Sequence, residues 1–295
     1  MKTTLVILAA GLGSRFGGNK QISHVGPNGE MLMEYSIRDA IDAGFDQIVF
    51  ILKEEMVPIV TESIGARIPS HMRVDYAVQD MTKMPEWYAV PTERTKPFGT
   101  VHAVLCAKDV IEGAFATVNA DDYYGKEAFS LMHEMLLTLD SEKKAAMVPY
   151  ILGNTMSENG GVTRGVCNIR CSKLREVVET HDIHYDESRK IVGEFGELTG
   201  KEKVSMNIWG FHPKALDMMQ TYFEDFLKGL APNELKAECL LPVMVNEALA
   251  EKKLSVTAKA STDKWFGITY QADREVVIEE LKNLHANGVY PEKLF

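Results

Sequence analysis

Near its N-terminus the chain reads Leu5-Val6-Ile7-Leu8-Ala9-Ala10-Gly11-Leu12-Gly13-Ser14-Arg15-Phe16-Gly17-Gly18-Asn19-Lys20. The continuous apolar run is typical of a strand that is buried on both faces of a sheet. The glycines after it let backbone N–H groups approach a bulky anion, and Arg15 and Lys20 add positive charge where phosphates would lie. Two common phosphate loops are excluded, because the run lacks Gly-x-x-x-x-Gly-Lys-Ser/Thr and Phe16 stands where Gly-x-Gly-x-x-Gly needs its last glycine. These residues alone leave open whether the loop binds phosphate or only turns the chain.

Strand-like and helix-like segments alternate from this loop to about residue 125, which indicates a parallel sheet with right-handed crossovers. Strands are expected at residues 46–52, 73–79 and 114–119, and helices at residues 31–44, 54–67 and 99–108. Residues 80–97 contain three prolines and no periodicity, so they are expected to form a long loop. Loops of this length inside compact domains are often functional.

From residue 126 the pattern is more varied and indicates a mixed or antiparallel region. We expect a helix at residues 127–139, strands at 145–151, 160–171, 174–180 and 204–211, and an exposed polar hairpin at 182–200. Further helices are expected from Pro213 and over residues 240–252, and short strands over 254–258 and 265–270. The last helix is expected to have Asp273 as its N-cap. The chain is therefore expected to be one domain over residues 1–295, in which residues 261–295 pack back onto two halves, about 1–125 and 126–260.

Composition limits the classes of function. The formal net charge is −10 and the basic residues are scattered, which argues against a nucleic-acid partner. The four cysteines include no Cys-x-x-Cys, so buried thiols are favoured over a metal site or a disulfide. No apolar run reaches transmembrane length, and the first run leads into glycines rather than a cleavage site. We expect a soluble, cytoplasmic protein without a membrane partner, and leave open whether it is a homo-oligomer.

Two adjacent carboxylates, Asp121 and Asp122, directly follow the strand expected at residues 114–119. In open α/β sheets ligands bind outside the carboxyl ends of the strands, which is also where the glycine loop lies. Paired carboxylates there suit a hard cation such as Mg²⁺, which bridges to substrate phosphates. The alternative is a helix cap or a solvated turn. Together with Arg15 and Lys20, a phosphate–metal site for phosphoryl or nucleotidyl transfer becomes the better explanation.

The same residues resemble a known family, the sugar-1-phosphate nucleotidyltransferases. The resemblance rests on Leu-Ala-Ala-Gly-Leu-Gly-Ser-Arg with a lysine a few positions later, Gly99-Thr100-Val101-His102-Ala103, and Val118-Asn119-Ala120-Asp121. It covers almost the whole chain in order, and the first motif is also found in molybdenum-cofactor relatives. It implies a glycosyltransferase-A-like α/β fold, that is, a Rossmann-type mixed sheet flanked by helices.

The resemblance also implies a role for individual positions. The backbone of Ala10, Gly11 and Gly13 would hold the nucleotide, Gln79 with Gly99 and Thr100 would contact its base, and Gly165, Glu179 and Asn207 would contact the sugar phosphate. Arg15 would bind the β and γ phosphates, Lys20 would neutralise charge between the α-phosphate and the departing pyrophosphate, and Asp121 would be a Mg²⁺ ligand. Residues 126–260 would then be the sugar-phosphate-binding half. Each sugar-contact residue also has a structural interpretation, as a bulge glycine, a solvated strand end or a structural side chain.

The chain departs from the family pattern in two places. The loop from Gly17 to Gly29 has an unusual sequence, which suggests an unusual substrate. Many members also place a second metal-binding aspartate just after a C-terminal tryptophan, whereas Trp265 is followed by Phe-Gly-Ile-Thr. Asp263 and Asp273 are the nearest alternatives, so the second metal ligand is unassigned.

The sequence therefore predicts an Mg²⁺-dependent transferase that condenses an NTP with a sugar 1-phosphate, with UTP favoured. Two alternatives stay open: the same fold acting with CTP on a non-sugar phosphate acceptor, and a catalytically silent nucleotide-binding homologue. Two weaker motifs are read structurally or left open. His181-x-x-His184 is interpreted as incidental histidines of a polar hairpin, and Trp87-Tyr88 is either a lid over the base or a staple for its loop.

Overall fold

A computed structural model describes residues 1–11, 24–268 and 271–295. Its first half contains the predicted parallel sheet, formed by β1 (Thr3–Leu8), β2 (Gln47–Leu52), β3 (Arg73–Val78) and β4 (Ala114–Asn119) in the order β3-β2-β1-β4. β1 is buried on both faces, as its apolar run predicts. Leu5 and Ile7 belong to the core on one side of the sheet, and Val6 belongs to the core on the other side.

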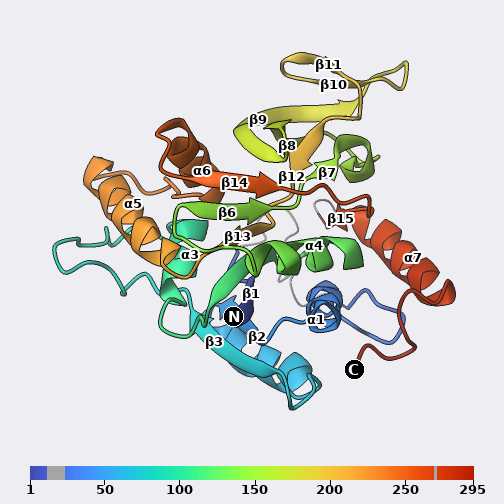
Figure 1. Cartoon of the computed structure of the whole chain (residues 1–295), viewed down its shortest axis with the longest axis horizontal. Helices are drawn as coiled ribbons and strands as arrows, with labels where there is room; N and C mark the ends of the chain where they lie inside the picture. The colour runs from blue at the N-terminus through green and yellow to red at the C-terminus, as the bar shows by residue number, and fades with distance from the viewer. Residues whose placement is uncertain (12–23, 269–270) are drawn as a thin grey trace.

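Helices cover both faces of this sheet (Figure 1). α1 (Leu32–Ala43) and α4 (Lys126–Leu136) supply apolar residues to the core with Leu5, whereas α3 (Thr100–Cys106), α5 (Ala215–Gly229) and α6 (Leu241–Ala250) supply the core with Val6. The predicted helix over residues 54–67 is instead three short pieces: η2 (Glu54–Met56), α2 (Val57–Val60) and the π-type turn η3 (Thr61–Gly65). The Thr61 and Ser63 hydroxyls donate to carbonyls four residues earlier, a contact that bends helices.

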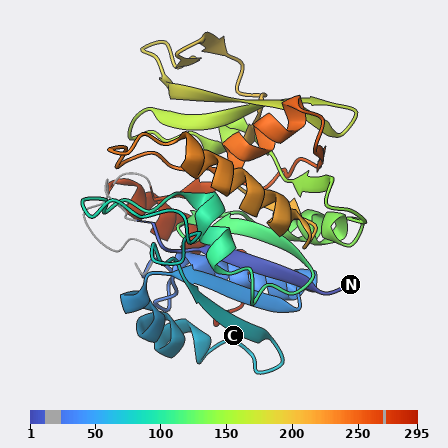
Figure 2. The same cartoon turned by 90° about the vertical axis from the view of Figure 1, so that its left-hand side faces the viewer.

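The second half extends the sheet with mostly antiparallel strands. β13 (Trp209–Phe211) pairs with β4, and the order continues β6 (Lys144–Met147), β14 (Ser255–Ala258), β9 (Lys173–Tyr185), β8 (Val162–Arg170), β12 (Lys203–Ser205) and β7 (Tyr150–Ile151). β10 (Ile191–Gly193) and β11 (Gly196–Leu198) form a small hairpin beside the end of β9. Figure 2 shows this hairpin and β8–β9 at the opposite end of the molecule from β3, with α5 and α6 in front of the sheet between them.

Two predicted strands are each divided in the structure. The strand expected at residues 145–151 is β6 and β7, separated by Val148-Pro149, because proline cannot donate to a sheet ladder. The strand expected at residues 204–211 is β12 and β13, separated at Asn207, which has a left-handed backbone (φ 64°). This second break places Asn207 at the carboxyl end of β4, as its contacts below demonstrate.

The C-terminal segment packs against the first half. α7 (Asp273–Ala286) and the residues after it contribute Tyr290 and Leu294 to a core with Tyr35 of α1 and Tyr123 of β5 (Asp122–Tyr123). β5 pairs with β15 (Phe266–Gly267). The prediction of Asp273 as the N-cap is wrong by one residue: Ala272 is the N-cap, and the Asp273 carboxylate instead accepts hydrogen bonds from Ser157 and Asn159. In the described residues, no helix is both long and apolar enough to span a bilayer.

Candidate active site

The carboxyl ends of β1 and β4 lie side by side. Leu8 is in register with Asn119, and the Ala120 N–H donates to the Leu8 carbonyl at 3.2 Å. The loop that begins with Ala10 and Gly11 therefore leaves the sheet beside the turn that carries Asp121. Gly13, Arg15 and Lys20 lie outside the described residues, so their predicted roles stay predictions.

Asp121 and Asp122 have different surroundings although they are neighbours in the chain. Asp122 is 8% exposed, and its Oδ2 accepts hydrogen bonds from the Asn119 amide (2.8 Å) and the Tyr124 hydroxyl (3.2 Å). Its Oδ1 lies close to Gly267, where an added Cβ would be only 2.6 Å away. Asp121 is half-buried and lines a cavity at the end of the sheet. Both carboxylates line this cavity, and Asp121 is the more exposed of the two.

This cavity has a volume of about 560 Å³ and lies between the two halves of the sheet. It brings together Asp121 with the three predicted sugar-phosphate residues, Gly165, Glu179 and Asn207. The first half contributes the end of β4 and its turn, and the second half contributes β8, β9 and β12. An apolar wall is formed by Leu240, which precedes α6, and by Pro242 and Val243 of that helix. Residues nearly 90 positions apart in the sequence thus face one space.

Strand register explains why Ser205, Gly165 and Glu179 meet at the cavity. Ser205 of β12 pairs with Gly165 of β8, and Gly165 pairs with Glu179 of β9, so the three residues form a row across the sheet. The middle of the row has no room for a side chain, because a Cβ at position 165 would lie 2.7 Å from Val177 Cγ1. The glycine keeps the cavity open between its two neighbours.

The predicted base-contacting residues form a separate small cluster. The Gln79 side-chain amide donates to the Gly99 carbonyl at 3.1 Å, and the Thr100 hydroxyl accepts a hydrogen bond from the Leu241 N–H at 2.8 Å. Gly99 has φ +91°, and its backbone lies against Cys239, which precedes α6. The three positions are therefore joined to one another and to the start of the helix that forms the apolar wall of the cavity.

The two alternatives for a second metal ligand are both used elsewhere. Asp263 Oδ2 accepts a hydrogen bond from the Glu127 N–H at 2.8 Å and so caps the start of α4, and burial raises the pKa of its carboxyl. Asp273 lines a different cavity, of about 250 Å³, on the far side of Trp265. In the described part of the chain, no group of three or more His, Cys, Asp or Glu side chains could hold a metal ion.

Sequence reasoning missed several lining residues. Asn246 of α6 faces the cavity, and its Oδ1 accepts a hydrogen bond from the Val177 N–H at 3.0 Å. The signal was present, since Asn246-Glu247 is a polar pair inside an otherwise apolar helix. Arg164 lines the cavity beside Gly165. It is 8% exposed, it stacks over Trp265 at 4.8 Å, and burial lowers its pKa to about 10.

The loop at residues 80–97 is fastened by one of its two adjacent aromatics. Tyr88 packs edge-on against the buried Phe98 with 5.9 Å between ring centroids, whereas Trp87 is 53% exposed. Tyr88 thus anchors the loop, and a lid function for Trp87 stays a prediction.

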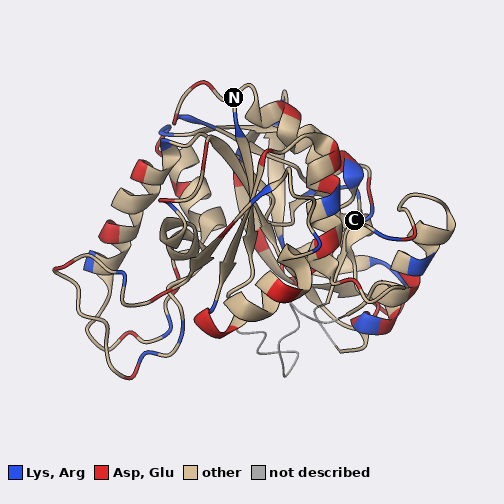
Figure 3. Cartoon of the chain, turned by 90° about the horizontal axis from the view of Figure 1, so that it is seen from below, with Lys and Arg blue, Asp and Glu red and all other residues tan. Residues whose placement is uncertain are grey.

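Figure 3 shows Lys and Arg dispersed among Asp and Glu rather than gathered along one element, in keeping with the charge pattern of the sequence.

The parallel half and the mixed half meet at a cavity beyond the strand ends, which is where open α/β sheets bind their ligands. Residues 5–150 match the family model described as the MobA-like NTP transferase domain, and this part of the chain belongs to that family. No curated protein sequence matches the chain.

Two solved structures share the fold over nearly the whole chain. One, from Bacillus anthracis and in complex with sucrose, is described as a glucose-1-phosphate thymidylyltransferase; it is 15% identical, with a TM-score of 0.62, over 95% of this chain and 96% of that one. The other is the inositol-1-phosphate CTP transferase from T. maritima, which is 11% identical, with the same TM-score and coverage. These matches confirm the predicted fold class and the resemblance to nucleotidyltransferases.

Proposed function

We propose that this protein condenses a nucleoside triphosphate with a phosphorylated small molecule, releasing pyrophosphate. The observation that carries the proposal is the cavity in which Asp121, at the end of the nucleotide-type half, faces Gly165 and Glu179 of the second half. An acceptor in this cavity would lie next to a triphosphate held by the loop after β1. A sugar 1-phosphate is the favoured acceptor, because the lining combines hydrogen-bonding groups with an apolar wall.

The reaction needs no covalent enzyme intermediate. An oxygen of the acceptor phosphate attacks the α-phosphorus of the NTP, a new P–O–P linkage forms, and the bond to the β-phosphate breaks as pyrophosphate leaves. A phosphate monoester is already nucleophilic, so catalysis consists of positioning and charge neutralisation. Arg15 would bind the departing phosphates, and Lys20 would act at the bond that breaks.

The residues at the end of β4 fit a magnesium ion. Mg²⁺ is typically held by one or two carboxylates together with substrate phosphates, and it keeps several waters. Asp121 supplies one such carboxylate beside the loop that would hold the phosphates, whereas Asp263 and Asp273 are engaged elsewhere. When bound, the ion would supply positive charge to the phosphate oxygens.

The base and the acceptor have two candidate assignments. UTP is favoured because Gln79 with Gly99-Thr100 is most like the uridylyltransferases of N-acetylglucosamine 1-phosphate, and the bond from Gln79 to Gly99 would fix the amide beside a base. CTP with a non-sugar acceptor is the second candidate. It is favoured by the fold shared with the inositol-1-phosphate CTP transferase and by the unusual sequence from Gly17 to Gly29.

The test is a pyrophosphate-release screen of four NTPs against a panel of sugar 1-phosphates and alditol or choline phosphates, with Mg²⁺. We expect release with one acceptor class, and Asp121→Asn should lower it by at least about 100-fold. Asp217→Asn, an exposed aspartate on α5, is the matched control and should retain activity. Nucleotide binding without release under every combination would contradict the proposal and identify a silent homologue.

A further inference from the structure

A one-directional chain of hydrogen bonds runs from the core to the carboxyl end of β4. The Trp209 indole N–H donates to Asn207 Oδ1 at 3.1 Å, the Asn207 amide donates to Asn119 Oδ1 at 2.8 Å, and the Asn119 amide donates to Asp122 Oδ2 at 2.8 Å. An indole nitrogen can only donate. The direction of every bond in the chain is therefore set at its buried end, because Trp209 is fully buried.

The backbone around this chain is also specialised. Asn207 has φ +64° in the break between β12 and β13, a conformation that asparagine tolerates better than most residues. The Tyr124 hydroxyl lies within hydrogen-bonding distance of the Met206 carbonyl, the Asn119 N–H and Asp122 Oδ2, at 3.1, 3.0 and 3.2 Å respectively. These contacts connect the segment carrying Asn207 to both sides of the turn carrying Asp121.

We infer that Trp209, Asn207 and Asn119 form a positioning chain that fixes Asp121 for its metal ion by holding the carboxylate of Asp122. The inference rests on the proposed function, in which Asp121 is the metal ligand. Asp121 lies between the two ends of the turn that the chain closes, since Asn119 donates to Asp122 across it. Asp122 and Asn207 are thus positioning residues, and any acceptor contact of Asn207 would be additional.

Trp209 makes the inference testable because it does not line the cavity. A Trp209→Phe change removes the first donor while it leaves every cavity residue in place, so it reaches Asp121 only through Asn207 and Asn119. Asn207→Asp is a second, nearly isosteric change. It still accepts from Trp209 but can no longer donate to Asn119, whose amide would then turn and present its carbonyl oxygen to the Asp122 carboxylate.

The readout is direct binding of Mn²⁺, as a spectroscopic substitute for Mg²⁺, to the full-length protein with UTP and no acceptor, followed by electron paramagnetic resonance. We expect the Mn²⁺ dissociation constant to rise about 5-fold or more for Trp209→Phe and further for Asn207→Asp, which are ordinary sizes for outer-shell changes at metal sites. Turnover at saturating metal should recover more fully than turnover at low metal. Phe195→Leu, an aromatic substitution at an exposed site (72% exposed), is the control and should leave the constant unchanged.

Urea unfolding of each variant separates positioning from packing. A variant that loses stability but binds Mn²⁺ as the wild type does would overturn the inference, because the chain would then be only structural. If Trp209→Phe does not fold, Asn207→Asp decides by the same measurement. A wild-type protein that binds neither Mn²⁺ nor UTP and releases no pyrophosphate would instead contradict the proposed function.

Discussion

Asp121 and Asp122 are adjacent, yet only their environments distinguish them. Asp122 accepts hydrogen bonds from Asn119 and from the buried Tyr124. It also lies against Gly267, a contact that depends on the pairing of β5 with β15. The sequence predicts a carboxylate pair at this edge because both residues follow an apolar strand. It does not indicate that Asp122 is the more buried of the two, because that burial involves Tyr124 and Gly267, and Gly267 is far along the chain.

Lys20 is the residue on which the proposed chemistry depends most directly. Because Lys20 would neutralise charge that develops as pyrophosphate departs, Lys20→Ala should lower turnover by orders of magnitude while the fold stays intact. Pyrophosphate release measures turnover, and circular dichroism measures the fold. Lys214→Ala, at an exposed position before α5, is the matched control. Near-normal turnover in Lys20→Ala would eliminate this mechanism.

A substitution of Asp263 tests whether its carboxylate caps a helix or binds the metal ion. Its carboxylate accepts from the Glu127 N–H at the start of α4, so Asp263→Ala should lower the free energy of unfolding by about 1 kcal/mol. The Mg²⁺ concentration that gives half-maximal turnover should not change, because this carboxylate is used at the helix start. A large shift in that concentration would mean that Asp263 is the missing second ligand after all.

At the scale of elements, the order of the strands and helices could be predicted from the sequence, whereas the points at which single elements are interrupted could not. The apolar pattern of residues 204–211 predicts one strand, and its division at Asn207 follows from bonds to Asn119 and Trp209 that no local pattern reveals. The predicted helix over residues 54–67 is divided for a similar reason, since side-chain hydroxyls compete for its carbonyls. Both failures concern side-chain bonds that override propensity.

Gly99 is an element boundary with no room for a side chain. A Cβ there would lie 2.6 Å from the Cys239 carbonyl oxygen, and the backbone has φ +91°, so Gly99→Ala should lower the free energy of unfolding by about 2 kcal/mol or more. It should also raise the KM for the nucleotide, because Gln79 is bonded to the Gly99 carbonyl. Urea unfolding and initial rates measure the two effects.

The control for this change is Gly229→Ala at the end of α5, where an added Cβ would meet no atom within 4 Å. Alanine favours helix over glycine, so this variant should be neutral or slightly stabilised. Equal destabilisation of the two variants would mean that the contact of Gly99 with Cys239 is not tight in solution.

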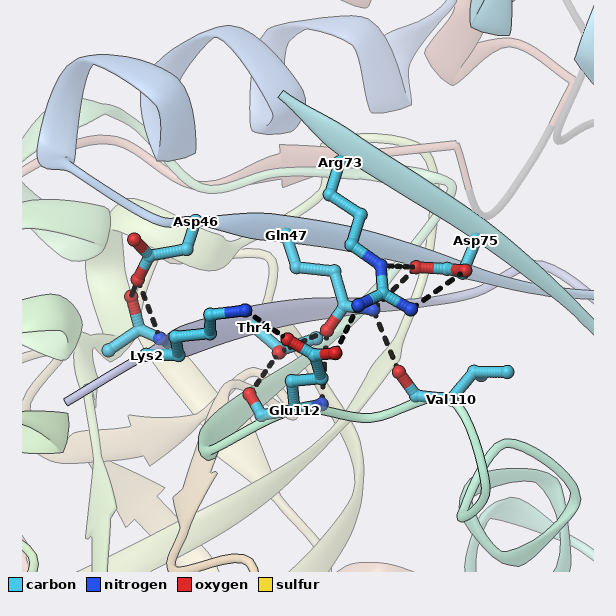
Figure 4. A network of polar contacts seen from close by, with 9 residues as sticks. Lys2, Thr4, Asp46, Gln47, Arg73, Asp75, Val110 and Glu112 are labelled. Carbon is cyan, nitrogen blue, oxygen red and sulfur yellow. Dashed lines mark hydrogen bonds and ion pairs between the residues drawn. The ribbon is translucent and has the colours of Figure 1, made fainter. Parts of the chain in front are cut away.

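At the opposite end of the parallel sheet, where its strands begin, the buried side-chain amide of Gln47 joins several segments (Figure 4). Gln47 is 1% exposed: its Oε1 accepts from the Thr4 hydroxyl and the Glu112 N–H, and its Nε2 donates to Asp75 and to the Val110 carbonyl. The network joins β1, β2 and β3 to the segment before β4. The Gln47 side chain thus accepts two hydrogen bonds through its oxygen and donates two through its nitrogen.

Gln47→Glu should therefore destabilise the protein although the side chain keeps its shape. The new carboxylate cannot donate and would face Asp75, so we expect a loss of about 2 kcal/mol or more in the free energy of unfolding at pH 7, measured with urea. Gln271→Glu, at an exposed position, is the control. A stability loss no larger than that of the control would contradict the importance of this network.

At the scale of the whole molecule, the sequence predicts a parallel half followed by a mixed half, with a site at the strand ends. Strand register brings Gly165 and Glu179 to the cavity of Asp121, and the break after β12 brings Asn207 there. The motifs alone could not establish this, because the pairing of β8, β9 and β12 is not read from local pattern. The sequence also predicts that residues 261–295 pack back. It does not indicate the partner, which is α1 and its buried Asp39.

Asp39 makes the docking of the C-terminal segment dependent on pH. Its Oδ2 accepts from the Tyr290 hydroxyl at 2.7 Å, its Oδ1 is buried without a partner among the described residues, and burial raises its pKa to about 7. Tyr290 and Lys126 oppose this rise, whereas Asp42 and Asp263 add to it. The folded protein therefore retains a proton on Asp39 that the unfolded chain has already released, over the window from about pH 4 to pH 7.

A raised carboxyl pKa stabilises the folded state below the ordinary pKa of aspartate, and this stability is lost as the pH rises through about 7. The wild type should thus lose on the order of 3 kcal/mol in its free energy of unfolding between pH 5 and pH 8, measured with urea. Asp39→Asn, which can still accept from Tyr290, should remove most of that slope and be more stable than the wild type at pH 8. Asp42→Asn, one turn along α1 on its exposed side, should keep the slope. An unchanged slope in Asp39→Asn would mean that Asp39 stays ionised in the folded protein, and that the C-terminal segment docks on a carboxylate rather than on a neutral acid.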